Sequence, residues 1–294
     1  MELFDIYKSK TKKKFKPLKC HPNKKNKTIH KDSCLDYTYL KKLKNIWNKR
    51  YPDNKIFTNK KKEIWEELKT KLSSCDNEMC WIDKTLQNNK NKKKIKKKLF
   101  APMTPDSWKS NINEWLSSSD LINVMNQYEE TYKNFKFLGP SPIDFDSIEY
   151  ENTCVWPEIC NISLRKLKNK GKTKIGFIFN TDEHYKSGSH WIALFVNLEN
   201  NYIYFFDSNG TKQPKQITNL INKLNNQCKK MNIRMNISNN HDFTHQHTNT
   251  ECGMYCLYFI ISLLSNKHDF NYFNTKRVAD KHVEEFRNIY FNNI

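Results

Sequence analysis

The sequence predicts an α+β fold with a small, mainly helical N-terminal arm. Three runs rich in β-branched and aromatic residues predict strands, at 174–181, 190–198 and 202–206. Three segments predict helices, at 213–231, in the stretch that begins at Cys252, and at 275–291. The basic N-terminal third shows helical spacing and no comparable strand pattern, which separates it from the rest of the chain.

The arm is predicted from two amphipathic segments. Apolar residues recur three and four positions apart in Tyr37-Leu40-Leu43-Ile46-Trp47 and in Ile64-Trp65-Leu68-Leu72, a spacing that places them on one helix face. Residues 1–30 are basic and polar and predict a flexible segment. The composition changes near residues 90–100, so we expect an arm domain at 1–98 and a second domain at 99–294.

The second domain begins with helical signals. Thr104-Pro105-Asp106 is typical of a helix start, and residues 120–135 predict another helix. The run Gly139-Pro140-Ser141-Pro142 predicts a break in regular structure. Further on, a short Glu-Asn-Asn turn joins two of the strands as a hairpin, and an additional strand is expected at about 232–238.

Positive charge is concentrated in the arm. The chain carries +20 overall, and residues 1–100 hold 30 Lys and Arg against 11 Asp and Glu, compared with 21 against 20 in residues 101–294. Lysine runs are typical of solvated, flexible segments that attract phosphate by releasing counterions. We expect non-specific DNA or RNA contact through Lys92, Lys93, Lys94, Lys96, Lys97 and Lys98. The competing interpretation is codon bias, because the chain is also rich in Asn and Ile.

Composition also restricts the cellular setting. No 18-residue apolar run and no N-terminal signal occur, so we expect neither membrane insertion nor secretion. Nine cysteines without disulfide-framework spacing favour free thiols in a reducing compartment. The cysteines of the arm, Cys20, Cys34, Cys75 and Cys80, are accordingly predicted as scattered structural thiols rather than metal ligands. No Walker loop, dinucleotide fingerprint or serine-hydrolase elbow is present, and no cofactor is expected.

Cys252 lies where a polar loop changes into an apolar, helix-like stretch, Thr248-Asn249-Thr250-Glu251-Cys252-Gly253-Met254-Tyr255-Cys256. The pattern predicts a thiol at a helix N-terminus, where backbone N–H groups and the helix dipole favour a thiolate. Taken alone, a cysteine is more often a small buried hydrophobe. Its interpretation therefore depends on the residues that accompany it.

Three other residues complete a candidate set. His190 starts one predicted strand and Asp207 follows the next, so a base and an orienting acid both stand at strand ends. Gln246 precedes Cys252 in the same loop, and its amide can donate to an oxyanion together with the Cys252 N–H. Singly, His190 could cap a strand, and Asp207 begins an ordinary loop signal. Their joint order favours nucleophilic catalysis.

In this order, His190-Trp191, Asp207-Ser208 and Gln246 with Cys252-Gly253 resemble the Ulp1/adenain clan of cysteine proteases (C48-like), which includes SUMO-specific and adenovirus proteases. The segments at 186–196 and 245–253 are most similar to the polyprotein-processing proteases of African swine fever virus and related large DNA viruses. The resemblance covers the C-terminal two-thirds and is thin before it. Those viral enzymes carry an amide where this chain has Asp207, so the acid here is closer to the adenovirus form.

The resemblance implies a papain-like/adenain-like cysteine protease core. It implies that Cys252 is the nucleophile, His190 the base, Asp207 its orienting acid and Gln246 an oxyanion donor, with Trp191 and Gly253 beside the substrate groove. It also implies a cysteine endopeptidase that cleaves viral core or capsid polyproteins after Gly-Gly-type motifs during virion maturation. The corresponding location is the virion and the viral assembly sites of the host cytoplasm.

Three other interpretations of the same residues remain. A ubiquitin-like or SUMO deconjugase would use the same four side chains on another substrate. A nucleic-acid-binding packaging protein could retain a vestigial protease fold, although the intact catalytic set argues against decay. Zinc at His241-Asp242-Phe243-Thr244-His245 is disfavoured, because the two imidazoles share one face only on a helix and no helical period runs through this segment.

Overall fold

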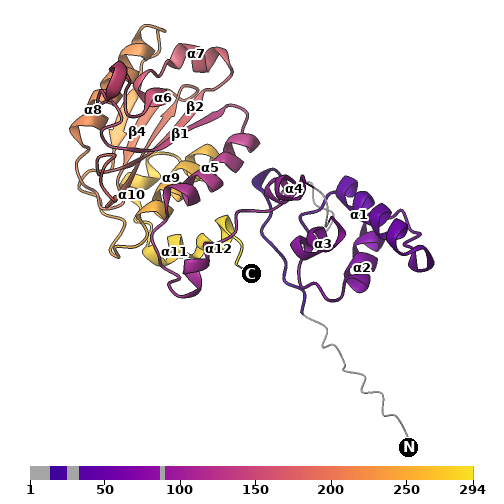
Figure 1. Ribbon diagram of the computed structural model, residues 1–294. Coiled ribbons are helices and arrows are strands. Elements are labelled where there is room, and N and C mark those ends of the chain that lie inside the picture. The colour runs from indigo at the N-terminus through magenta and orange to yellow at the C-terminus, as the bar shows by residue number, and fades with distance from the viewer. Residues whose placement is uncertain (1–13, 25–32, 87–89, 294) are drawn as a thin grey trace, which may run out of the picture. The chain divides into compact units, whose positions relative to one another are not determined.

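The computed structural model describes residues 14–24, 33–86 and 90–293, and the chain divides into two compact units, 1–101 and 102–294 (Figure 1). Much of the segment predicted to be flexible, at 1–13 and 25–32, lies outside the described residues. Within the part of the chain that is described, no helix is long and apolar enough to cross a membrane.

The first unit is a small helical arm. It contains α1 (Tyr37–Arg50), α2 (Lys61–Lys71), α3 (Glu78–Thr85) and α4 (Lys92–Leu99), with short 3-10 turns η1 (Pro22–Lys24) and η2 (Pro52–Asn54). The predicted apolar faces of α1 and α2 are buried, and they pack with Trp81 and Ile82 of α3 around one core. The expected helical arm is therefore present, with two helices that the periodicity had not predicted.

The lysine run is helical, which corrects the expectation of a flexible segment. Residues 92–99 form α4 because Ile95 and Leu99 lie on one face and are buried in the arm core. Lys93, Lys94, Lys97 and Lys98 are exposed, whereas Lys92 and Lys96 are partly buried and pair with Asp83 at 3.2 and 2.6 Å. Burial of these two apolar residues, Ile95 and Leu99, is enough to order a run of lysines whose charge alone had suggested a flexible segment.

Six of the nine cysteines are paired, so the prediction of free structural thiols was wrong for them. The structure joins Cys20 with Cys34, Cys75 with Cys80, and Cys154 with Cys160. The free cysteines are Cys228, Cys252 and Cys256, all buried. The paired cysteines are only 14, 5 and 6 positions apart in sequence, and their pairing depends on the distance and direction of the side chains in the fold, which spacing along the chain does not give.

The second unit is built on one five-stranded sheet of order β1-β2-β3-β4-β5. The strands are β1 (Phe135–Pro142), β2 (Lys174–Asn180), β3 (Trp191–Asn197), β4 (Tyr202–Phe206) and β5 (Asn236–Asn239). The middle pairs β2–β3 and β3–β4 are antiparallel, and the outer pairs are parallel. The predicted strands and hairpin are confirmed, and the fourth expected strand lies slightly later than predicted.

Helices cover both faces of the sheet (Figure 1). On one face, α5 (Ser118–Thr131) and α9 (Cys252–Leu264) pack against side chains such as Ala193 and Phe195. On the other face, α8 (Lys215–Lys229) packs against Ile192 and Leu194. Because alternate side chains of β3 enter both layers, the strand is apolar throughout, as expected for a sheet buried on both faces.

Two predicted features of this unit were wrong. The run Gly139-Pro140-Ser141-Pro142 ends β1 instead of breaking the chain; β1 is an edge strand, where proline is tolerated, and its register shifts between Leu138 and Ser141. The single helix expected at 275–291 is divided into two short ones, α11 (Asp280–Glu285) and α12 (Arg287–Tyr290). A further short helix, α10 (Tyr272–Thr275), ends where the expected helix begins.

The remaining elements are short and connect the layers. The helix start expected at Thr104-Pro105-Asp106 forms only the 3-10 turn η3 (Asp106–Lys109), whereas the next predicted helix is present as α5 with a capping box at Ser117 and Asp120. Between β1 and β2 lie η4 (Tyr150–Asn152), α6 (Pro157–Cys160) and α7 (Leu164–Asn169).

Candidate active site

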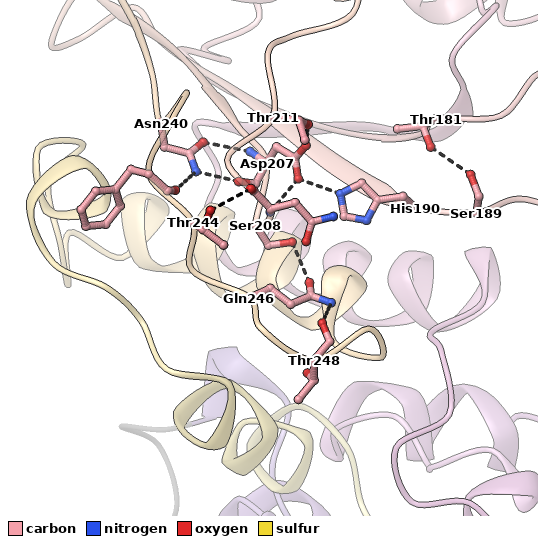
Figure 2. A network of polar contacts seen from close by, with 12 residues as sticks. Thr181, Ser189, His190, Asp207, Ser208, Thr211, Asn240, Thr244, Gln246 and Thr248 are labelled. Atoms are coloured by element: carbon pink, nitrogen blue, oxygen red, sulfur yellow. Dashed lines mark hydrogen bonds and ion pairs between the residues drawn. The ribbon is translucent and has the colours of Figure 1, made fainter.

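The sheet brings His190 and Asp207 together at one edge. His190 directly precedes β3 and Asp207 directly follows β4, and the antiparallel register, with Ala193 opposite Phe206, places these strand ends side by side. The His190 Nε2 atom lies 2.7 Å from Asp207 Oδ1. Figure 2 draws this contact as a dashed line. With Nε2 donating to the carboxylate, Nδ1 is the ring nitrogen left to accept a proton.

The Asp207 carboxylate is held by a set of hydrogen bonds and is almost fully buried. Oδ1 also accepts the Asn209 N–H at 2.9 Å, and Oδ2 accepts a short hydrogen bond from the Thr211 hydroxyl. The side chain of buried Asn240 makes two hydrogen bonds to the Asp207 backbone, accepting its N–H at 3.0 Å and donating to its carbonyl at 2.6 Å. Figure 2 shows these two hydrogen bonds, here called the Asn240 clamp, which fix the position of the Asp207 carboxylate beside His190.

The tight turn after Asp207 requires Gly210. Its φ is +70°, and a Cβ there would approach the backbone of Phe243 to 2.9 Å. This close contact brings the loop that carries Asn240 and Gln246 against the end of β4. A side chain at this position would therefore displace both the Asn240 clamp and the loop.

Electrostatics stabilise a protonated His190. Burial alone lowers the pKa of the imidazole, but hydrogen bonds to Asp207 and to Cys252, with the charge of Asp207, outweigh burial and raise this pKa to about 9. Burial raises the pKa of Asp207, yet the hydrogen bond and charge of His190 hold it below its usual value. The pair therefore favours a carboxylate beside an imidazolium.

Cys252 is the first residue of α9, as predicted, and hydrogen-bonds to His190. Its neighbour Glu251 is fully buried and forms a bidentate ion pair with Arg287, with N–O distances of 2.8 and 2.9 Å. Arg287 also donates to the Glu114 carbonyl at 2.9 Å and lies over the Trp108 ring. This buried pair anchors the residue directly before the thiol, and so fixes where α9 begins.

The other free thiols are unsuited to the same role. Burial raises the pKa of Cys256 well above the ordinary value for a thiol and that of Cys228 to about 11. Neither thiol is hydrogen-bonded to a histidine by any contact in the described structure. Of the three free cysteines, Cys252 alone lies at a helix N-terminus beside an imidazole.

Gln246 is fixed in the loop before α9. Its Oε1 accepts the Ser208 hydroxyl at 2.7 Å, and its Nε2 donates to the Thr248 carbonyl at 2.6 Å. The backbone N–H groups of His245 and Gln246 both donate to the Ser208 carbonyl at 2.9 Å. One of the two Nε2 protons is thus used internally, and the other is available to a ligand. The oxyanion role of Gln246 stays a prediction.

A groove leads to the imidazole. It has a volume of about 720 Å³, and its wall includes Trp115, Leu116, Trp156, His190 and Trp191. The rim is acidic, with Glu149, Asp182 and Glu183 against Lys186 and His184. Trp191, which the sequence had assigned to a substrate groove, lines this groove, and its role toward a substrate stays a prediction.

The predicted groove residues Trp191 and Gly253 differ in position. Trp191 is mostly buried and donates through Nε1 to the Leu116 carbonyl at 2.9 Å, so it borders the groove while packing into the core. Gly253 is buried, and a Cβ there would approach Leu116 and Trp191 to 3.0 and 3.2 Å. Glycine is therefore needed for packing beneath the groove wall, rather than as part of its exposed surface.

The alternative metal site is not formed by His245. Both of its ring nitrogens are engaged, Nε2 with the Phe273 carbonyl at 2.9 Å and Nδ1 with the Val278 N–H at 3.1 Å. Burial lowers its pKa to about 4, so the ring is neutral and structural. In the described ranges no cluster of three or more His, Cys, Asp or Glu side chains is arranged to hold a metal ion.

Sequence reasoning missed the residues that hold the candidate set in place. These are Ser208, Thr211, Asn240, Thr248 and the Glu251–Arg287 pair. No sequence signal marked Asn240, and Ser208 was noted only as the neighbour of Asp207. Arg287 is 36 positions from Glu251 in a separate helix, and no local pattern marks such a partner.

Comparison with known proteins agrees with this geometry. Residues 123–294 match the model of the Ulp1 protease family, C-terminal catalytic domain. The chain is 36% identical over 184 residues to "Putative thiol protease R355" of Acanthamoeba polyphaga mimivirus, covering 63% of this chain and 59% of that protein. It is 25% identical over 181 residues to a cysteine protease of African swine fever virus, covering 58% of this chain and 66% of the relative.

A solved structure shows the same fold. The crystal structure of a protease from African swine fever virus superimposes with a TM-score of 0.68 at 22% identity, covering 96% of this chain and 98% of that one. The sequence matches span less than two-thirds of the length of the two viral relatives. Because the family model covers more than half of the chain and includes all four candidate residues, this chain belongs to the Ulp1 protease family.

Proposed function

We propose that this protein is a cysteine endopeptidase whose nucleophile is Cys252. The observation that carries the proposal is the chain of contacts from Asp207 through His190 to the thiol at the start of α9. Family membership supports the reaction class. The named relatives are thiol and cysteine proteases of large DNA viruses, which supports the same assignment.

In the proposed mechanism, His190 Nδ1 takes the Cys252 proton while Asp207 holds Nε2–H. The thiolate attacks the scissile carbonyl carbon, and the oxyanion accepts hydrogen bonds from the Cys252 N–H and the spare Gln246 Nε2–H. The imidazolium then protonates the leaving amine, and the C–N bond breaks to leave a thioester. His190 next deprotonates a water molecule that attacks the thioester, and the departing thiol regains its proton.

We propose that the substrates are viral core or capsid polyproteins, cleaved after Gly-Gly-type motifs. The groove beside His190 is bordered by indole rings, and residues without side chains suit a passage next to Trp191. The viral origin of the relatives supports processing during particle assembly, in the virion and at assembly sites in the cytoplasm. Contact with DNA or RNA through the exposed lysines of α4 would keep the enzyme near the genome.

A substrate panel tests this function. Gly-Gly-Xaa peptides, a core polyprotein precursor, and SUMO and ubiquitin fusions are each incubated with the wild-type protein and with Cys252→Ala. We expect the precursor and peptides to be cleaved after the glycine pair by the wild type alone. Cleavage restricted to the SUMO or ubiquitin fusions would instead establish a deconjugase. No cleavage of any substrate would contradict the endopeptidase assignment.

A further inference from the structure

The arm unit contains a pocket of about 300 Å³ that the proposed protease chemistry does not use. It lies where the C-terminal ends of α1, α2 and α3 come together. The lining residues that matter here are Trp47, Arg50, Tyr51, Lys71, Ser74 and Lys84. Three cations and two aromatic rings therefore share the wall of one small cavity.

The three cations have almost no acidic partner. Arg50 donates to the carbonyls of Lys84 and Thr85 at 2.9 and 3.4 Å, and Lys84 makes a short hydrogen bond to the Ser74 hydroxyl. Lys71 makes a short hydrogen bond to the Asn54 side chain. Among the described residues, the carboxylate in contact with these cations is that of Glu67, 3.9 Å from Lys71 Nζ. Most N–H donors of the three side chains remain available.

The acidic residue nearest in sequence to Lys84 already has cationic partners of its own. Asp83 precedes Lys84, but its carboxylate is paired with Lys92 and Lys96 of α4 at 3.2 and 2.6 Å. Those two contacts hold the pKa of Asp83 below its usual value, against the opposing effect of burial. The pocket cations and the α4 lysines therefore form two separate basic groups within the arm.

The helix dipoles offset only part of the positive charge of the three pocket cations. Arg50 and Lys71 end α1 and α2, and Lys84 lies in the last turn of α3, where cations offset helix dipoles. Each helix C-terminus carries roughly half a negative charge, so three of them balance about half of the three positive charges. The remainder is close in size to the charge of a phosphate group at neutral pH, roughly −1.5 to −2 for a monoester.

The aromatic residues indicate what accompanies the anion. The rings of Trp47 and Tyr51 lie 4.2 Å apart, and Tyr51 is 42% exposed at the mouth of the pocket. An exposed ring beside phosphate-binding cations is the combination that single-stranded nucleic acids use, with a base stacked on the ring. The cavity also exceeds the volume that one ordered water molecule needs.

We propose that this pocket binds a phosphorylated nucleotide, either free or as part of a single nucleic-acid strand. Arg50, Lys71 and Lys84 hold the phosphate, and the Tyr51 ring stacks on the base. The site is distinct from the lysine face of α4 and from the candidate active site. It gives the arm a specific anchoring point in addition to diffuse attraction by surface charge.

The test compares two charge-matched variants of the full-length protein. Arg50→Gln/Lys84→Gln removes pocket cations, and Lys93→Gln/Lys94→Gln removes two exposed lysines of α4. Binding of inorganic phosphate, AMP and a short oligothymidylate is measured by calorimetry and fluorescence anisotropy at about 50 mM and 200 mM salt. We expect saturable binding by the wild type, weakened about tenfold or more in the pocket variant because charge-assisted hydrogen bonds are lost. The α4 variant should weaken oligothymidylate binding less and leave AMP binding unchanged.

Photo-crosslinking of 5-bromouridine-containing RNA adds a second readout. The cross-link should map to Tyr51, and Tyr51→Leu should remove it while circular dichroism shows a folded arm. Tighter binding of AMP than of inorganic phosphate would identify a free nucleotide as the ligand. Binding of the oligomer alone would identify a single nucleic-acid strand as the ligand. No saturable binding by the wild type, or equal loss in both charge variants, overturns the proposal. Unchanged peptide cleavage in all variants keeps this outcome separate from the protease assignment.

Discussion

The two units of the chain use charge differently. In the catalytic unit the key charges are buried and matched to opposite charges, with Asp207 against His190 and Glu251 against Arg287. Among the described residues of the arm, most cations lie on the surface or around the pocket. In the same described part of the arm, the carboxylate of Glu78 is buried and accepts hydrogen bonds from neutral donors, namely the Ser33 hydroxyl, the Cys34 N–H and the Trp65 indole.

This difference separates two uses of charge within one chain. A buried charge with a matched partner fixes the position of neighbouring groups, because moving either partner leaves the other unpaired at low dielectric. A surface cation leaves the fold nearly unaffected and remains available to an anionic partner. Substitutions in the catalytic unit should therefore alter chemistry or folding, and those on the arm surface should alter binding.

The largest effect is expected at the nucleophile and its base. Cys252→Ala and His190→Ala should each lower kcat by on the order of 10⁴-fold or more, because the thiolate is lost or is no longer formed. Cys256→Ala, four positions along the same helix, should retain activity, since its thiol is held neutral by burial. Initial rates on a Gly-Gly peptide check this; loss in the Cys256 variant with activity in the Cys252 variant would reverse the assignment.

The second-largest effect is expected at the buried ion pair of Glu251 with Arg287, directly before Cys252. Glu251→Gln leaves the Arg287 cation without its partner and should destabilise the protein by about 3–5 kcal/mol. The corresponding change in the arm, Glu78→Gln, strands no cation and should cost about 1–3 kcal/mol through a misplaced hydrogen-bond donor. Chemical denaturation measures both. Equal destabilisation would show that the contrast between the two buried carboxylates has no energetic meaning.

A smaller loss is expected at Gln246. Gln246→Ala removes one oxyanion donor and should lower kcat by about 10²–10³-fold while KM changes little. Thr248, which accepts from the same amide through its backbone carbonyl, provides the control, because Thr248→Ala keeps that carbonyl. If kcat is unchanged in Gln246→Ala, the residue has no part in the reaction.

The mildest change should appear in the pH profile. The pKa of His190 is raised to about 9, so the imidazolium that protonates the leaving amine is present below that pH and is lost as the pH rises through it. Asp207→Asn retains a group that orients the ring but removes the negative charge, so the His190 pKa falls and the alkaline limb of kcat/KM moves to lower pH. Asp207→Ala should lose more activity than Asn. An unmoved alkaline limb in Asp207→Asn would exclude Asp207 as the source of the raised pKa.

Local patterns predicted the parts of the fold that depend on local chemistry. The strands around His190 and Asp207 were recognised from continuous apolar runs, and the start of α9 from the change at Cys252. The edge strand β1 was missed because Gly139 and Pro140 are breakers in most settings, and only its place at the sheet edge makes them acceptable. The disulfides were missed because pairing depends on the distance and direction of the side chains in the folded chain, even for cysteines that are only 5, 6 or 14 positions apart. The ordering of the lysine run was missed because it depends on burial of Ile95 and Leu99 in the arm core.

The candidate site likewise contains residues that could be identified from the sequence and residues that could not. The four proposed catalytic residues could be identified from residue type, order and a family resemblance. The groups that hold them could not, because Asn240 lies 33 positions from Asp207 and Arg287 36 positions from Glu251, and their roles arise only once the chain has folded. Gly253 was assigned to the groove for its small size, whereas the structure uses that size for packing under Trp191.

Covalent trapping tests directly whether Cys252, activated by His190, is the nucleophile. The full-length protein is treated with a Gly-Gly peptide bearing a C-terminal vinyl electrophile, and the modified cysteine is located by mass spectrometry. We expect one adduct, on Cys252, which excess peptide substrate suppresses and which forms far more slowly in His190→Ala. An adduct on Cys228 or Cys256 in place of Cys252, or an equal rate of modification in His190→Ala, would contradict this assignment.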